Sequence, residues 1–258
     1  MDVSLGLAAA APADTIRDAA RAAEEAGLRT FWLNDTPGAD ALLGLAAAAE
    51  VTDRIRLGVG VIALDRWPAD RIAERISRAG LPLDRFVLGV GSGAAPHPVA
   101  TVEAEVRGLR ELAVAPILVG ALGPRVRRLA AEQADGLLLS WLPPDLAAAA
   151  RDEAVAPAAA AGRPRPHVAL YARTAVDAEA HPALRDEAER YASFPGYAAN
   201  FARTGRGPLD GSILATDGPS LRVRISEYEH AVDELVLRAI TADGSPAAIR
   251  GIIDAVAG

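Results

Sequence analysis

The sequence predicts one (β/α)8 barrel, the TIM-barrel fold, over residues 1–258. Eight short apolar runs alternate with eight segments of helical spacing. The length of 258 residues lies within the range in which an α/β barrel forms a single domain. Between Ala115 and Trp141 a buried strand, a helix and a second buried strand follow one another, and this order requires a parallel sheet.

The expected strands are runs of branched apolar residues bounded by turn-forming residues. They lie at 3–7, 30–33, 55–64, 85–90, 116–119, 137–139, within 166–176, and at 234–240. The third run carries Gly58 and Gly60, which indicate a bulge or a close approach of another backbone.

The expected helices follow the strands, with start and stop signals such as the Asp14 cap and the Gly27 stop. They lie at about 14–26, 40–51, 68–78, 102–112, 124–134, 143–161, 181–202 (one or two helices) and 245–257. Glycines, prolines and scattered polar residues interrupt the alternation at 204–225. This composition predicts a loop or short lid near 204–230, with room for a short helix after Pro219.

An open, doubly wound sheet is the alternative fold. Its dinucleotide-binding glycines should follow the first strand, but Leu7 leads into alanines and Pro12. A second glycine cluster, at Gly89, Gly91 and Gly93, lacks the required spacing. The sequence therefore favours the barrel over the open sheet.

Composition excludes several classes of function. The chain has no cysteine and no lysine, so thiolate nucleophiles, thiolate metal sites and Schiff-base lysines are excluded. A net charge of −7 argues against a nucleic-acid partner. The sequence contains no apolar run of membrane-spanning length and no basic leader, so we expect a cytoplasmic protein without a membrane partner.

The turn between the fifth strand and its helix predicts an anion site. Gly120 and Gly123 loosen the backbone before Pro124, and Arg125 adds positive charge. Free N–H groups at a helix start attract anions, although the same residues are also typical of an ordinary helix start. If Gly123 has a positive φ, Gly123→Val should weaken anion binding more than Arg125→Ala.

Function in a barrel lies at the carboxyl ends of the strands. That rule selects Asn34, Asp35, 62–65, 91–93, 120–123, Ser140, Trp141, Arg173 and Thr174. The largely apolar character of this mouth suits a flat aromatic ligand.

The selected side chains also have ordinary structural interpretations. Asn34, Asp35 and Asp65 fit helix or turn caps, and Trp141 fits either a packing residue at the rim or a wall of a ring pocket. His97 is the histidine expected near the mouth. No two histidines have metal-ligand spacing, so no metal site is expected.

Four motifs in order resemble the luciferase-like monooxygenase family. They are AARAAEEAGLRTFWLND, IRLGVGV, RFVLGVGSG and ILVGALGPRVRRLAAEQADGLLLSWLPP. The resemblance runs over most of 3–176 and resumes at Asp233, and it identifies the chain as a shortened member of this family of flavin- and deazaflavin-dependent oxidoreductases. Departures from the family pattern include Thr36 after Asn34-Asp35, where many members carry a histidine, and Leu83-Asp84 in place of a glycine pair.

The resemblance implies a barrel with the cofactor ring across its mouth and the phosphate-bearing tail at the turn after strand five. A bulge with an unusual peptide bond, at about Val61 to Ala63, would support the ring. The implied cofactor-binding residues are Val61, Ile62, Ala63, Gly91, Ser92, Gly120, Ala121, Leu122, Gly123, Pro124, Arg125, Ser140 and Trp141. Asn34, Asp35 and His97 are the candidate catalytic residues.

The function implied is hydride transfer between a small organic substrate and coenzyme F420 or FMN. F420 is preferred because its anionic tail fits an arginine-bearing helix start. The alternative is a non-catalytic flavin-binding or scaffold protein. A homodimer is also expected, since barrels of this family usually pair and the alanine-rich helix at 39–50 offers a smooth surface.

Overall fold

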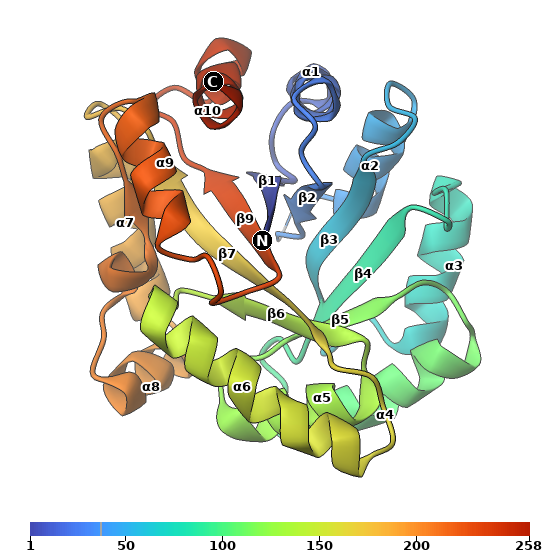
Figure 1. The fold of residues 1–258 in the computed structure, drawn as a ribbon. Helices are drawn as coiled ribbons and strands as arrows, with labels where there is room; N and C mark the ends of the chain where they lie inside the picture. Colours follow the sequence, from blue (N-terminus) through green and yellow to red (C-terminus); the bar gives the residue numbers. More distant parts are fainter. Residues whose placement is uncertain (37) are drawn as a thin grey trace.

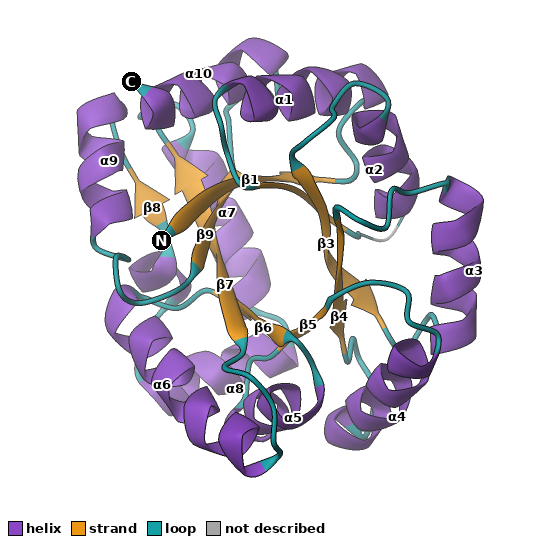
Figure 2. Ribbon diagram, turned by 45° about the vertical axis from the view of Figure 1, so that its right-hand side comes forward, coloured by secondary structure: helices purple, strands orange, loops and turns teal. Residues whose placement is uncertain are grey.

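The computed structural model describes residues 1–36 and 38–258. Eight parallel strands form a closed ring, with the helices outside it (Figures 1 and 2). The ring order is β6-β5-β4-β3-β2-β1-β9-β7, and the pairing of β6 with β7 closes it. The predicted TIM barrel is confirmed.

The strands have nearly the predicted bounds. They are β1 (Asp2–Ala8), β2 (Thr30–Asn34), β3 (Arg56–Ala63), β4 (Phe86–Gly91), β5 (Ile117–Gly120), β6 (Gly136–Ser140), β7 (His167–Ala175) and β9 (Glu234–Ala239). A two-residue strand, β8 (Ile213–Leu214), pairs with the end of β7 outside the ring.

The helices follow their strands as expected. They are α1 (Ala13–Glu25), α2 (Ala41–Ala49), α3 (Ala69–Ala79), α4 (Pro98–Glu111), α5 (Pro124–Gln133), α6 (Pro144–Ala160), α7 (His181–Ala192), α8 (Pro195–Thr204), α9 (Gly218–Ser226) and α10 (Pro246–Ala257). The side chains of Asp40 and Ser245 cap α2 and α10 by accepting hydrogen bonds from backbone N–H groups of the first turn. Asp14 lies inside the first turn of α1 rather than at its cap.

The segment at 204–225 is more regular than the predicted loop. After α8 it forms a 3-10 turn at Pro208–Gly211, then β8 and then α9, which packs against α10. Asp217 caps α9 by accepting a hydrogen bond from the Ser220 N–H at 2.8 Å. Local turn and cap signals therefore organise this polar stretch, and the helix expected after Pro219 is present.

The barrel interior is layered. The middle layer is apolar and consists of Trp32, Val87, Leu118, Leu138, Ala169, Tyr171 and Val236. Neighbouring strand residues such as Leu33, Leu170 and Leu237 belong to a separate cluster that includes helix residues such as Ile16 and Ile252. This alternation separates the side chains that point into the barrel from those that pack against the helices.

The layer at the amino ends of the strands is built around one buried carboxylate. Glu234 accepts hydrogen bonds from Ser4 Oγ (2.6 Å) and Trp32 Nε1 (2.8 Å), and His167 Nε2 lies 3.0 Å from its other oxygen. Burial alone raises the pKa of Glu234, but the bonds from His167, Ser4 and Trp32 outweigh it and hold the pKa at about 2. This end of the interior thus holds a buried, ionised carboxylate with three hydrogen-bond partners.

Within residues 1–36 and 38–258, no helix combines the length and apolar character needed to cross a membrane.

Candidate active site at the barrel mouth

The inward-facing layer at the carboxyl ends of the strands is polar. It lies two residues beyond the middle layer, since alternate strand residues share a face. Trp32, Leu138, Tyr171 and Val236 are thus followed by Asn34, Ser140, Arg173 and Arg238. Arg173 and Arg238 are paired neighbours in the β7–β9 register.

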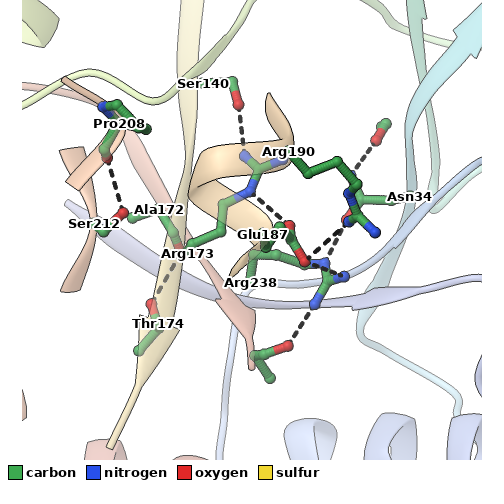
Figure 3. Close-up of polar contacts among 12 residues, drawn as sticks. Asn34, Ser140, Ala172, Arg173, Thr174, Glu187, Arg190, Pro208, Ser212 and Arg238 are labelled. Carbon is green, nitrogen blue, oxygen red and sulfur yellow. Dashed lines mark hydrogen bonds and ion pairs between the residues drawn. The ribbon is translucent and has the colours of Figure 1, made fainter. Parts of the chain in front are cut away.

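A hydrogen-bonded network joins these four side chains to α7 (Figure 3). Glu187, on α7, accepts from Arg173 Nε at 3.2 Å and lies 3.8 Å from Arg238 Nη2. Arg173 Nη1 donates to Ser140 Oγ at 2.6 Å. Arg238 Nε donates to Asn34 Oδ1 at 2.8 Å, and Asn34 Nδ2 donates to the Gly60 carbonyl at 2.6 Å. The network therefore fixes β2, β3, β6, β7 and β9 around one point.

The network carries a surplus of positive charge. The side chains of Arg173, Arg238 and Glu187 are only 3%, 11% and 11% exposed, so two buried cations share one buried anion. A third cation, Arg190, lies 3.6 Å from Glu187 but is 63% exposed. Burial lowers the pKa of Arg238, and Glu187 offsets this only in part. An anionic or electron-rich ligand at this mouth would be electrostatically favoured.

Aromatic side chains from α7, α8 and the residue after β6 pack against the network. The Arg173 guanidinium lies 4.2 Å from the ring centre of Trp141 and 4.7 Å from that of Tyr191. Tyr191 also packs edge-on against Tyr197, at 4.9 Å between ring centres. Trp141 is 1% exposed and packs beneath the Arg173 guanidinium, and a role for it as a wall of a ring pocket stays a prediction. Its Nε1 is buried and has no hydrogen-bond partner among the described residues.

The backbone of β3, β4 and β5 forms the floor of the mouth, and the Val61 side chain covers two of its glycines. The register of β3 against β4 shifts between Val59 and Ile62, and the Gly60–Val61 peptide bond is cis. A β-carbon on Gly91 would lie 2.9 Å from Val61 Cγ2, and one on Gly120 would lie 3.0 Å from Val61 Cγ1. The Val61 side chain therefore fills the space above both glycines. The bulge and unusual peptide bond are present, one residue before the stretch that the resemblance indicated.

The turn before α5 presents free donors. The first helical bond runs from Arg127 N–H to the Gly123 carbonyl at 3.1 Å, so the N–H groups of Arg125 and Val126 have no acceptor within the helix. The Leu122 carbonyl accepts from Arg127 Nη1 (3.1 Å) and from Arg203 Nη2 of α8 (3.3 Å). These bonds fix the turn against α8.

Gly123 does not have the special backbone expected of it. Its φ is −98°, within the range of any residue, and a β-carbon there would meet no atom within 4 Å. The expectation that a side chain at Gly123 strains the turn is therefore wrong. The turn is held by the Leu122 carbonyl instead.

The other predicted residues lie apart from the network. Asp35 is adjacent to Asn34 but accepts from the Ala41 N–H at 3.3 Å and from Arg66 Nη2 at 3.1 Å, at the start of α2. Burial raises the pKa of Asp35, against the opposing effects of Ala41 and Arg66. His97 is exposed and precedes α4. The structure thus places Asn34 in the network and leaves both Asp35 and His97 outside it.

Three more predicted positions lie near the floor. Ile62 is buried in the outer core cluster and Ala63 is half-buried at the end of β3. Ser92 is half-buried, and its hydroxyl donates to the Gly93 carbonyl at 3.4 Å. A role in binding for Ile62, Ala63 and Ser92 stays a prediction.

Comparison with known proteins decides the family. The model of the family described as luciferase-like monooxygenase matches residues 2–112 and 97–257. The chain belongs to the luciferase-like monooxygenase family. The resemblance seen in the sequence is confirmed.

Solved structures with the same fold include proteins that use different cofactors. An F420-dependent secondary alcohol dehydrogenase in complex with an F420–acetone adduct is 19% identical, with a TM-score of 0.76 over 99% of this chain and 98% of that one. The coenzyme F420-dependent tetrahydromethanopterin reductase from Methanopyrus kandleri is 18% identical, with a TM-score of 0.73 over 99% and 98%.

A structure with FMN is similar to about the same degree. The oxygenating constituent of 3,6-diketocamphane monooxygenase from Pseudomonas putida, in complex with FMN, is 14% identical, with a TM-score of 0.72 over 98% of this chain and 97% of that one. No curated protein sequence matches the chain. These likenesses establish the luciferase-like fold and leave the cofactor open.

Sequence reasoning missed two central members of the mouth network. Arg238 lies within the strand ELVLRA. A lone arginine among apolar residues indicates that it pairs with a carboxylate if it is buried, but not which carboxylate. Glu187 lies on a helix rich in charged residues, and nothing local separates it from its exposed neighbours. Arg173 was selected by its place at a strand end, which proved to be the informative signal.

Proposed function

We propose that this luciferase-like protein is an oxidoreductase that moves a hydride between a small organic substrate and a bound F420 or FMN, with F420 preferred. The observation that carries this proposal is the asymmetric mouth. One surface is the β3 bulge, whose Val61 side chain packs over Gly91 and Gly120, and the other is the buried cationic network of Arg173 and Arg238. A flat, polar ring needs both surfaces.

The residues at the mouth fit such a cofactor. When bound, the cofactor supplies the hydride chemistry itself, and the protein supplies orientation, electrostatics and exclusion of water. Val61, packed over Gly91 and Gly120, offers an apolar surface to a ring, and Trp141 offers a buried N–H that lacks an acceptor among the described residues. Arg173 and Arg238 stabilise negative charge that develops next to them.

The turn before α5 fits the phosphate-bearing tail. It offers the free N–H groups of Arg125 and Val126 at the positive end of the helix dipole. Two buried donors, Asn200 Nδ2 and Arg127 Nε, also lack partners among the described residues. Arg203 bridges Asn200 and the Leu122 carbonyl, so these donors are close to the same turn. The donors and nearby arginines favour the anionic tail of F420.

A fluorescence titration with F420 and with FMN tests the proposal. We expect F420 to bind in the micromolar range and FMN more weakly. Gly120→Leu should abolish binding because its side chain must displace Val61 and enter the floor. Gly251→Ala is the matched control, since a β-carbon there meets no atom within 4 Å and Gly251 lies in α10, outside the mouth, and it should leave affinity unchanged. The proposal fails if the folded protein binds neither cofactor at millimolar concentration.

A second candidate function is non-catalytic binding by the same barrel. The observation that favours it is that both polar atoms of Asn34 are already occupied, by Arg238 and the Gly60 carbonyl. An absorbance assay separates the two candidates. Cofactor that binds tightly but exchanges no hydride with a panel of alcohols, aldehydes and ketones would favour the non-catalytic role.

We also infer a homodimer formed through α2. This helix is almost entirely apolar, and Leu43 on it is 61% exposed. An apolar helix face that packs against its twin would cover this side chain. Light scattering at micromolar concentration should show twice the monomer mass, and Leu43→Glu should shift the protein to monomer. A wild-type protein that is entirely monomeric would refute this inference.

A further inference from the structure

The opposite end of the barrel holds a hollow. It has a volume of about 560 Å³ and lies at the amino ends of β1, β2, β3, β7 and β9. This volume is in the range of sites for small molecules. Strands rise by about 3.3 Å per residue, so His167 at this end is about 20 Å from Arg173 at the mouth along β7. The hollow is therefore separate from the proposed cofactor site.

The lining of this hollow is rich in guanidinium groups. Arg29, Arg56, Arg151 and Arg165 line it, against the two carboxylates Asp2 and Asp233. Both carboxylates are already engaged. Asp2 pairs with Arg29 at 3.4 Å, and Asp233 pairs with Arg165 and accepts from the Val168 N–H at 2.8 Å. The lining is thus basic in a protein whose net charge is −7.

Arg56 is the unmatched cation of this lining. Its side chain makes no hydrogen bond and no ion pair with any residue in 1–36 or 38–258, whereas Arg151 pairs with Asp152 at 2.8 Å. Burial lowers the pKa of Arg56, and the neighbouring Glu234 and Asp2 offset this only in part. Glu234 itself is occupied by Ser4, Trp32 and His167. A half-buried guanidinium that is not paired with any described residue has N–H donors available to bind a ligand.

We propose that this hollow binds a small oxyanion of two or more negative charges, a phosphate compound or a di- or tricarboxylate. Guanidinium groups present paired N–H donors whose geometry matches carboxylate and phosphate oxygens. Arg56 supplies donors that are not paired with any described residue, and Arg29, Arg151 and Arg165 line the same hollow. A metal cation is disfavoured there, because the available carboxylates are held by arginines.

Calorimetric titration with pyrophosphate and with citrate tests this site, using protein without an amino-terminal tag. We expect one of the two anions to bind and to raise the melting temperature, while sodium chloride at equal ionic strength does neither. Binding by pyrophosphate alone identifies a phosphate ligand, and binding by citrate alone identifies a carboxylate ligand. If neither binds at millimolar concentration, the proposal is overturned.

Two variants make the test specific. Arg56→Gln should weaken binding by about tenfold or more, because it removes a charged pair of donors. The variant should be no less stable than the wild type, since burial disfavours the Arg56 charge by more than Glu234 and Asp2 favour it. Arg54→Gln is the matched control: it removes the same charge two residues away, from an exposed side chain outside the lining, and should change affinity by less than about twofold. Equal losses in both variants would mean non-specific attraction and would refute the site. Cofactor is absent from every arm, so the outcome is independent of the proposed oxidoreductase function.

Discussion

The two ends of the barrel interior bury charge in opposite ways. At the amino ends of the strands, one carboxylate, Glu234, is surrounded by three donors. At the carboxyl ends, two guanidinium groups, Arg173 and Arg238, share one carboxylate, Glu187. The middle layer between them is apolar, so the two networks do not touch.

This difference in charge balance suggests that the Glu234 network is structural and that the Glu187 network can accept an anionic ligand. Glu234 has its hydrogen bonds satisfied, and nothing further is needed to keep its charge buried. The mouth has more positive charge than its own residues neutralise, which a purely structural network has no reason to maintain. Changes at Glu234 should therefore alter the free energy of unfolding alone, whereas changes at the mouth should alter both the free energy of unfolding and ligand affinity.

Removing the single anion of the mouth should have the largest effect on stability. Glu187→Gln leaves Arg173 and Arg238 without a counter-charge, and we expect a loss of about 3–5 kcal/mol in the free energy of unfolding, measured with urea. Arg190→Gln is the control, because Arg190 faces the same carboxylate but is 63% exposed, and it should cost about 1 kcal/mol or less. Equal costs would show that the mouth carries no buried surplus of charge.

At the amino end, Glu234→Gln should cost about 2–3 kcal/mol at neutral pH by removing the charge that three donors face. The folded pKa of Glu234, about 2, is below its ordinary value of 4.5. Its contribution is thus complete above about pH 4.5 and is lost as the pH falls towards 2. Melting curves of wild type and variant should converge in that window. A stability difference that stays constant from pH 7 to pH 2 would contradict the assigned ionised state.

An intermediate effect is expected at the floor of the mouth. Gly120→Ala places a β-carbon 3.0 Å from Val61 Cγ1, and overpacking of this kind costs about 1–3 kcal/mol. Val61→Ala should relieve most of that cost, so the double variant should be more stable than the sum of the two single changes predicts. Strict additivity in urea denaturation would show that the two residues do not compete for space.

The smallest effect is expected at the rim. Arg125 is exposed, so Arg125→Ala should lower cofactor affinity by less than about tenfold, or about 1 kcal/mol, and less still at high salt. Arg128→Ala is the matched control, because Arg128 is exposed one turn away and is paired with Glu132. Loss of all binding in Arg125→Ala would replace the helix-start site with a side-chain clamp.

The sequence predicts the barrel well because each of its strands is a short apolar run between turn formers. At 204–225 it predicts only the short helix after Pro219, and it misses the 3-10 turn at Pro208–Gly211 and the two-residue strand β8. Such elements are too short for a periodic signal, and only local capping chemistry indicates them.

The candidate site was predicted only in part, for a related reason. The strand-end rule finds Asn34, Ser140 and Arg173, but a strand buried on both faces gives no alternation that separates inward from outward residues. Asp35 was therefore grouped with Asn34 although the two point to different neighbours. Glu187 reaches the mouth through tertiary packing of α7, which no local pattern records.

The packing of Val61 above Gly91 and Gly120 has a consequence for protein engineering. The three positions occupy one shared volume, so a scan that changes one position at a time will report both glycines as intolerant. A library that randomises the three together should recover combinations in which a smaller residue at 61 admits a side chain at 91 or 120. Such combinations would reshape the floor of the mouth while the cationic side stays intact, which makes this trio a tuning element for ligand shape.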